Sequence, residues 1–129
     1  MTRVYVAAGS NVQPASNLVR ALNELRQHFP DLVTSTAYRN QAVGFEGDDF
    51  INLVCGFESD LDVRSVIARL HEAEAACGRE RNAPRWAPRS MDLDLLLFGD
   101  MVCDEPGLVL PRPDLTRKAY MLGPMAELA

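Results

Sequence analysis

The chain contains 129 residues, of which 47% are hydrophobic and 24% are charged, as in an ordinary soluble globular domain. Its formal net charge of −5 argues against broad nucleic-acid binding, which requires a basic surface. The sequence has no apolar run long enough to span a bilayer, and its N-terminus lacks the apolar stretch of a secretory signal. We therefore expect one domain over residues 1–129, in the cytoplasm, with no nucleic-acid or membrane partner.

Three cysteines, Cys55, Cys77 and Cys103, lie far apart in the sequence. A disulfide framework normally uses an even number of cysteines, and a zinc site normally places some of them a few residues apart. We therefore interpret the three cysteines as small core residues of a protein in a reducing compartment.

The first part of the chain predicts a strand, a helix and a second strand. Residues 3–8 are rich in β-branched and aromatic residues, and they end at the turn-forming residues 9–11, Gly-Ser-Asn. Pro14 is suited to the first turn of a helix, in which apolar residues recur at helical spacing until Pro30 ends it. Residues 32–38, rich in Val, Thr and Tyr, predict the second strand.

The middle of the chain predicts a strand followed by a helix. Residues 40–49 carry turn-forming and acidic residues and predict a mobile loop, and residues 50–57 predict the third strand. Either Asp60 or Asp62 can cap the next helix, whose apolar residues again recur at helical spacing. Gly78 is the expected stop signal of this helix.

The last part of the chain begins with a loop over residues 79–90, which contain two prolines, and continues with a fourth strand over residues 91–98. A short extended piece over residues 108–111 and a helical end from about Asp114 follow. The complete order, β-α-β-β-α-β, indicates an α+β protein of the ferredoxin-like class. We expect an antiparallel sheet with both helices on one face and an additional C-terminal helical segment.

Two carboxylates head the predicted fourth strand. Asp92 and Asp94 are two residues apart, so they share a face of the strand at a separation of about 7 Å. We expect Leu96 and Phe98 on this face, and the opposite face to carry Met91, Leu93, Leu95 and Leu97. Desolvating two carboxylates is costly unless a cation or a donor meets them, and one or two magnesium ions suit this pair. An exposed strand end, solvated or paired with nearby arginines, is the alternative.

A cluster of arginines precedes this strand in an otherwise acidic chain; its members are Arg79, Arg81, Arg85 and Arg89. The planar guanidinium group matches phosphate oxygens in a bidentate geometry. Carboxylates that hold metal and arginines that hold phosphate together favour phosphoryl transfer. A solvated charged loop is the alternative interpretation.

Phe50 and Asn52 are two apart in the predicted third strand, so they also share a face. An aromatic ring can stack on a flat heterocycle while an amide reads its edge, and Tyr120 could supply the second aromatic surface. An aromatic residue in a strand is more often part of the core.

The segment at residues 85–98, R-W-A-P-R-S-M-D-L-D-L-L-L-F, resembles the signature of the 6-hydroxymethyl-7,8-dihydropterin pyrophosphokinases of folate synthesis. The resemblance covers nearly the whole chain, with further matches at residues 9–11, 35–39, 49–52, 78–81 and 121–124. It implies a monomeric, ATP-dependent enzyme. In this family two magnesium ions bridge the phosphates of ATP, and the hydroxymethyl oxygen of the pterin attacks the β-phosphorus, so that AMP leaves.

The resemblance also implies roles for individual residues. The metal ligands would be Asp92 and Asp94, which with Arg79 and Arg89 form the catalytic set. ATP would be bound by Glu74, Arg81, Arg85, Trp86, Arg112 and Lys118. The pterin would be held by Val43, Gly44, Phe50, Asn52 and Tyr120. Residues 9–11 are expected to shape a turn without contacting the reacting atoms.

Four positions depart from the family pattern. Arg112 replaces a histidine, Lys118 an arginine and Ala87 a glycine, and the loop that begins at Asn40 differs in sequence. Two alternatives to the full activity therefore stay open. One is a divergent paralogue that acts on a related pterin or only binds one, and the other is a ferredoxin-like sensor of a small molecule.

Overall fold

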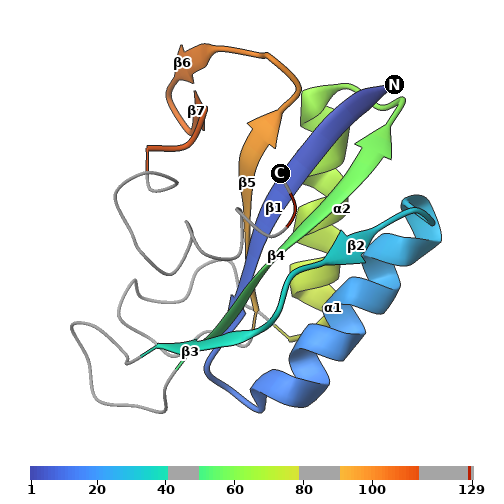
Figure 1. Cartoon of the computed structure of the whole chain (residues 1–129), viewed down its shortest axis with the longest axis vertical. Helices are drawn as coiled ribbons and strands as arrows, with labels where there is room; N and C mark the ends of the chain where they lie inside the picture. Colours follow the sequence, from blue (N-terminus) through green and yellow to red (C-terminus); the bar gives the residue numbers. More distant parts are fainter. Residues whose placement is uncertain (41–49, 79–90, 114–127, 129) are drawn as a thin grey trace.

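The computed structural model describes residues 1–40, 50–78, 91–113 and 128, shown in Figure 1. One antiparallel sheet contains the strands β1 (Thr2–Ser10), β2 (Val33–Thr34), β3 (Tyr38–Asn40), β4 (Phe50–Ser59) and β5 (Asp92–Phe98). Their order is β2-β4-β1-β5, and β3 also pairs with β4. The helices are α1 (Pro14–His28) and α2 (Val63–Ala76), and a separate antiparallel pair consists of β6 (Cys103–Glu105) and β7 (Leu108–Leu110).

Both helices begin and end where local signals predict. Pro14 occupies the first turn of α1, and the helix stops two residues before Pro30. At the start of α2 the carboxylate of Asp62 accepts a hydrogen bond of 2.8 Å from the backbone N–H of Ser65, so Asp62 is the cap. Gly78 follows α2 with a φ of 84°, a left-handed conformation that favours glycine.

The core lies between the helices and one face of the sheet (Figure 1). Alternate residues of the central strands point into it, because side chains alternate across a strand. Those of β1 and β4 are Val4, Val6, Ala8, Leu53, Cys55 and Phe57. The rings of Phe29, just after α1, and Phe57 stack with their centroids 4.0 Å apart. The α+β class, with an antiparallel sheet and two helices, is therefore confirmed.

Strand β1 is longer than the sequence predicts. The sequence predicts a turn at Gly9 and Ser10, but both belong to the strand and pair with Asn52 and Ile51 of β4. The turn prediction is wrong for these two residues because neighbouring strands provide backbone partners that outweigh local turn preference. Gly9 also pairs with Asp92 on its other side, so it lies in the middle of the sheet.

The predicted second strand is two short strands, β2 and β3, with a break between them at residues 35–37. The cause is visible at Ser35, whose backbone N–H donates to the carbonyl of Val54 at 2.8 Å. The N–H of Val54 in turn donates to the hydroxyl oxygen of Ser35 at 2.9 Å. A side chain therefore replaces a backbone acceptor, which interrupts the regular ladder. Near the other end of the chain, β7 falls within the predicted extended piece, whereas its short partner β6 was not predicted.

Strand β5 contains a bulge that changes which residues face the core. Tyr5 of β1 pairs with Leu97, but Val6 pairs with Leu95, so Leu96 is an extra residue on β5. As a result Phe98 packs in the core between the sheet and the helices. Leu97 instead packs with Leu96 on the opposite face. The predicted faces of Leu97 and Phe98 are thus wrong, because the strand does not alternate strictly past Leu95.

Cys55 and Cys77 are buried in the core, and Cys103 packs against it partly buried, which confirms their prediction as core residues. Burial raises the pKa of the Cys55 thiol to about 12. Within the described residues no helix is long and apolar enough to cross a membrane. The predicted helical end from about Asp114 lies, apart from Leu128, outside the described part of the chain.

Candidate active site

The candidate site lies on the open face of the sheet, by which we mean the face away from α1 and α2. Asn52 of β4, Gly9 of β1 and Asp92 of β5 form one row across three strands. The next row contains Val54, Ala7 and Asp94. The chain neighbours of the polar residues in these rows, Ile51, Leu53, Leu93 and Leu95, pack in or against the core on the other face. The open face therefore carries an amide and two carboxylates from separate strands.

Gly9 forms the floor under Asn52. A Cβ atom placed on Gly9 would lie 2.5 Å from Oδ1 of Asn52, so the amide rests directly on the glycine backbone. Only glycine permits this close approach. Sequence reasoning placed Gly9 in a turn and missed it as a site residue; a glycine next to a β-rich run can signal close packing as well as a turn. Phe50, two residues before Asn52, shares the same face and is partly exposed.

Asp92 and Asp94 are both partly exposed on the open face, at the strand that ends the sheet order. Arg112, which follows β7 in the chain, lies beside Asp94. Its Nη2 atom is 3.8 Å from Oδ1 of Asp94, its Nε donates to the carbonyl of Leu95 at 3.0 Å, and its backbone N–H donates to the carbonyl of Leu96 at 3.0 Å. The guanidinium group thus brings positive charge to the predicted metal pair.

Glu74, near the end of α2, approaches β5 from the helix side. Its side chain is buried, with the residue only 8% exposed, and Oε2 accepts a hydrogen bond of 2.9 Å from the backbone N–H of Leu93. Leu93 lies between the two aspartates in the sequence. Sequence reasoning assigned Glu74 to ATP and did not foresee this contact, because nothing local relates two residues 19 positions apart.

The two carboxylates fit a magnesium ion that is coordinated partly by the protein and partly by a substrate. Magnesium commonly takes one or two protein carboxylates, while phosphate oxygens and water complete its shell. Asp92 and Asp94 supply two carboxylates on one face. In the described ranges no three or more His, Cys, Asp or Glu side chains gather as a closed metal site. The pair therefore suits an ion held jointly with a phosphate compound.

The structure brings five of the predicted site residues to the open face or to the adjoining edge of β5; these are Phe50, Asn52, Asp92, Asp94 and Arg112. It places Glu74 behind the same edge. The remaining predicted residues lie outside the described part of the chain; these are Val43, Gly44, Arg79, Arg81, Arg85, Trp86, Arg89, Lys118 and Tyr120.

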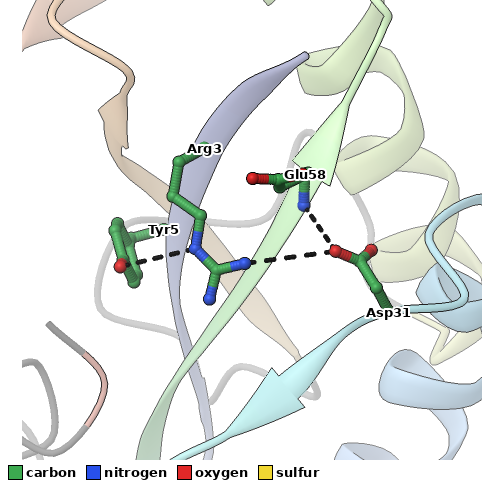
Figure 2. Close-up of polar contacts among 4 residues, drawn as sticks. All are labelled: Arg3, Tyr5, Asp31 and Glu58. Carbon is green, nitrogen blue, oxygen red and sulfur yellow. Dashed lines mark hydrogen bonds and ion pairs between the residues drawn. The ribbon is translucent and has the colours of Figure 1, made fainter.

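The other end of the open face also carries polar side chains, but they contact one another (Figure 2). Arg3 Nε lies 3.4 Å from the hydroxyl of Tyr5, and Arg3 Nη1 lies 4.0 Å from Oδ2 of Asp31. The same carboxylate oxygen accepts a hydrogen bond of 3.0 Å from the backbone N–H of Glu58. This cluster links the start of β1, the loop after α1 and the end of β4, and we interpret it as structural.

Together these features define an α+β protein with a carboxylate pair suited to metal and phosphate on its open face. The chain belongs to the 7,8-dihydro-6-hydroxymethylpterin-pyrophosphokinase (HPPK) family, whose model matches residues 5–129. This confirms the family predicted from the motif.

The chain is similar to proteins of several bacteria that share one name. The chain is 33% identical to the 2-amino-4-hydroxy-6-hydroxymethyldihydropteridine pyrophosphokinase of Pseudomonas aeruginosa, over 98% of this chain and 80% of that protein. It is 32% identical to the protein of that name in Bacillus subtilis, over 96% of this chain and 76% of the relative. For the Aquifex aeolicus protein the identity is 30%, over 99% of this chain and 81% of the relative.

Proposed function

We propose that this protein transfers pyrophosphate from ATP to the hydroxymethyl group of 6-hydroxymethyl-7,8-dihydropterin, a step of folate biosynthesis. The family match over residues 5–129 carries this proposal. In the reaction the hydroxymethyl oxygen bonds to the β-phosphorus, the bond from that phosphorus to the bridging oxygen of the α-phosphate breaks, and the hydroxyl proton is released. The products are AMP and the pterin diphosphate.

The aspartate pair is the proposed metal site, with two magnesium ions bound through Asp92 and Asp94. Bound magnesium supplies positive charge that neutralises the phosphates and orients them. The carboxylates share one face of β5, the last strand in the order of the described sheet, which supports this assignment. The catalytic set further includes Arg79 and Arg89, whose guanidinium groups suit the charge of a phosphoryl group in transfer.

The pterin is proposed to lie on the open face over the row that contains Gly9 and Asn52. Asn52 can offer both a donor and an acceptor to the edge of a flat ring, and its amide is supported by the glycine beneath it. Phe50 on the same face can stack on the ring, with Tyr120 on its other side. Backbone groups of Val43 and Gly44 complete the proposed pterin set.

ATP is proposed to approach from the β5 side of the sheet. Arg112 supports this direction, because its guanidinium group lies beside Asp94. Phosphates that bind the same metal ion as Asp94 would lie close to this positive charge. The other proposed ATP residues are Glu74, Arg81, Arg85, Trp86 and Lys118. Positive groups here neutralise the triphosphate, which adds specificity for a polyanion.

We further propose that the chain is one domain over residues 1–129 with a ferredoxin-like topology. The strand order β2-β4-β1-β5 supports this topology. It acts as a cytoplasmic monomer whose partners are ATP and the pterin, with no nucleic acid or membrane.

The direct test is an assay of the full chain with magnesium-ATP and 6-hydroxymethyl-7,8-dihydropterin, in which AMP and the pterin diphosphate are separated by chromatography. Equal formation of both products is the expected result. Measurable pterin binding without AMP would instead indicate the divergent paralogue or the sensor. The paralogue has one observation in its favour: Arg112, which replaces the family's histidine, pairs with one of the proposed metal ligands.

A further inference from the structure

We propose that Glu74 and Arg112 are positioning residues that hold the free edge of β5 and thereby keep Asp92 and Asp94 in the arrangement needed for metal binding. This inference rests on the proposed metal role of the two aspartates. It gives Glu74 and Arg112 a task beyond contact with ATP. We call the two residues and the backbone groups that they bind the edge clamp.

The edge clamp meets a requirement of the sheet. In the described sheet, β5 is the last strand and pairs on one side with β1, so its outward backbone groups have no strand partner. Leu93 presents an N–H group, and Leu95 presents a carbonyl group, on either side of Asp94 in the sequence. Glu74 accepts from the first at 2.9 Å, and Nε of Arg112 donates to the second at 3.0 Å. Side chains therefore take the place of a further strand.

The local register makes such support useful. Directly after Leu95 the pairing with β1 shifts by one residue at the Leu96 bulge. A shift of one residue moves a side chain to the other face of a sheet. An extension of the bulge toward the start of β5 would turn the aspartates away from the open face. Bonds to the backbone at Leu93 and Leu95 oppose that movement.

The burial of Glu74 supports a positioning role. Placing a carboxylate out of water is costly unless it receives hydrogen bonds, and a bond from a backbone N–H to a charged acceptor is stronger than a neutral one. An apolar residue at this position of α2 would leave the N–H of Leu93 without this acceptor. The side chain also reaches the strand from the core side, opposite to the face that carries the two aspartates.

Arg112 acts at the same strand with both its backbone and its side chain. Its backbone N–H binds the carbonyl of Leu96 within the bulge, which anchors the residue independently of its side chain. The guanidinium group then reaches back to Leu95 and to Asp94. Removing the side chain should leave the anchor in place, so a variant of this residue tests the clamp in a folded protein.

The experiment compares Glu74→Gln, Glu74→Ala and the control Glu72→Ala in the full chain, with the magnesium dependence of AMP formation as the readout. Glutamine keeps an acceptor for the N–H of Leu93, whereas alanine removes it. Glu72 lies on the same helix, is 56% exposed, and pairs with Arg69 instead of with β5. We expect Glu74→Ala to raise the magnesium concentration for half-maximal activity by about tenfold, as loss of a residue that orients a metal ligand does. Glu72→Ala should leave the magnesium requirement unchanged, and Glu74→Gln should require clearly less magnesium than Glu74→Ala.

Two results would overturn the inference. One is a glutamine variant that needs as much magnesium as the alanine variant, because glutamine keeps an acceptor for the N–H of Leu93. The other is an alanine variant with unchanged magnesium dependence. Amide hydrogen exchange gives an independent readout, because Glu74→Ala should accelerate exchange at Leu93 and Glu72→Ala should not.

Arg112→Met keeps the inference testable if Glu74→Ala does not fold. We expect this variant to fold and to require about threefold more magnesium, a smaller effect than that of Glu74→Ala because the backbone anchor persists. Unchanged magnesium dependence in Arg112→Met would remove Arg112 from the clamp. Asp94→Ala separates the two proposals: if it leaves the magnesium dependence intact, the proposed metal site is wrong, whereas a loss confined to Asp94→Ala contradicts the clamp alone.

Discussion

At both ends of the open face a polar side chain lies directly against a glycine of a central strand, but the two ends differ in their surroundings. At the aspartate end, which carries Asn52, Asp92 and Asp94, the amide lies on Gly9. At the arginine end, which carries the cluster of Figure 2, Tyr5 and Arg3 lie over Gly56. A Cβ atom on Gly56 would be 3.0 Å from the ring of Tyr5 and 3.2 Å from Nη2 of Arg3. In both central strands a glycine allows a side chain to lie directly against the backbone. The role of that side chain then depends on the groups around it.

The difference between the ends lies in the charges. At the arginine end the guanidinium group of Arg3 is near Asp31 and also lies 5.3 Å from the centre of the Tyr5 ring. Contact with Tyr5 and the nearby acids raises the pKa of Arg3 against the effect of burial, so this cation stays charged. At the aspartate end two carboxylates share one strand face, and the guanidinium group of Arg112 lies 3.8 Å from Asp94. The arginine end thus resembles a structural ion pair, whereas the aspartate end is the one that we propose binds a metal ion.

The largest expected effect separates the two ends directly. Asp94→Ala should lower the rate of AMP formation by about a thousandfold or more, since it removes a proposed metal ligand at the point of phosphoryl transfer. Its midpoint of thermal unfolding should stay equal or rise, because repulsion between two carboxylates is relieved. Activity assays and calorimetry on the purified variant check both parts.

The matched control for this prediction is Asp31→Ala at the arginine end. It should cost about 1 kcal/mol of unfolding free energy through loss of the bond to the backbone of Glu58, with turnover unchanged. If Asp94→Ala unfolds the protein, or if Asp31→Ala abolishes turnover, the functional division between the two ends is wrong.

A smaller effect is expected from the two glycines. Gly9→Ala should displace the amide of Asn52 and raise the KM for the pterin by about tenfold, which corresponds to the loss of one good hydrogen bond. The magnesium dependence should not change, because neither aspartate is touched. Steady-state kinetics with varied pterin measure this, and isothermal titration with the pterin confirms whether binding is affected.

Gly56→Ala provides the comparison for Gly9→Ala. The side chains of Tyr5 and Arg3 can move by a few tenths of an ångström, so we expect a loss of about 1 kcal/mol or less in stability and unchanged kinetics. An equal rise of the KM for the pterin in both glycine variants would show that Gly9 affects pterin binding only by stabilising the sheet, and not by supporting Asn52.

The smallest effect concerns the cap of α2, near the arginine end. The hydrogen bond from the backbone of Ser65 lowers the pKa of Asp62 in the folded protein below its ordinary value of 3.8. A lowered pKa in the folded state stabilises the protein above pH 3.8, and this contribution is lost as the pH falls through the folded value. Asp62→Ala should therefore melt a few degrees below wild type at neutral pH, and the gap should narrow in acid.

Thermal melts of wild type and Asp62→Ala at neutral and low pH measure this gap. Turnover at neutral pH should be the same in both, because the cap is remote from the aspartate end. A gap that widens in acid would contradict the assigned cause of the pKa shift.

Much of the fold was predictable because its signals are local. The start of α1 at Pro14, a cap of α2 at Asp60 or Asp62 and the stop at Gly78 depend on residues within one or two helical turns. The shared face of Asp92 and Asp94 follows from the two-residue period of a strand. The extent of β1 and the break at Ser35 were not predictable, since both depend on pairing with β4, far away in the sequence.

The sequence by itself determined the family, the α+β class and the shared face of the two carboxylates, because a long motif and short-range periodicity are properties of neighbouring residues. Only the tertiary structure decided that Gly9 supports Asn52, that Leu96 bulges out of β5, and that Glu74 and Arg112 reach the strand of the aspartates. These contacts join residues more than 15 positions apart. Their geometry depends on how helices and strands pack, which no local pattern in the chain encodes.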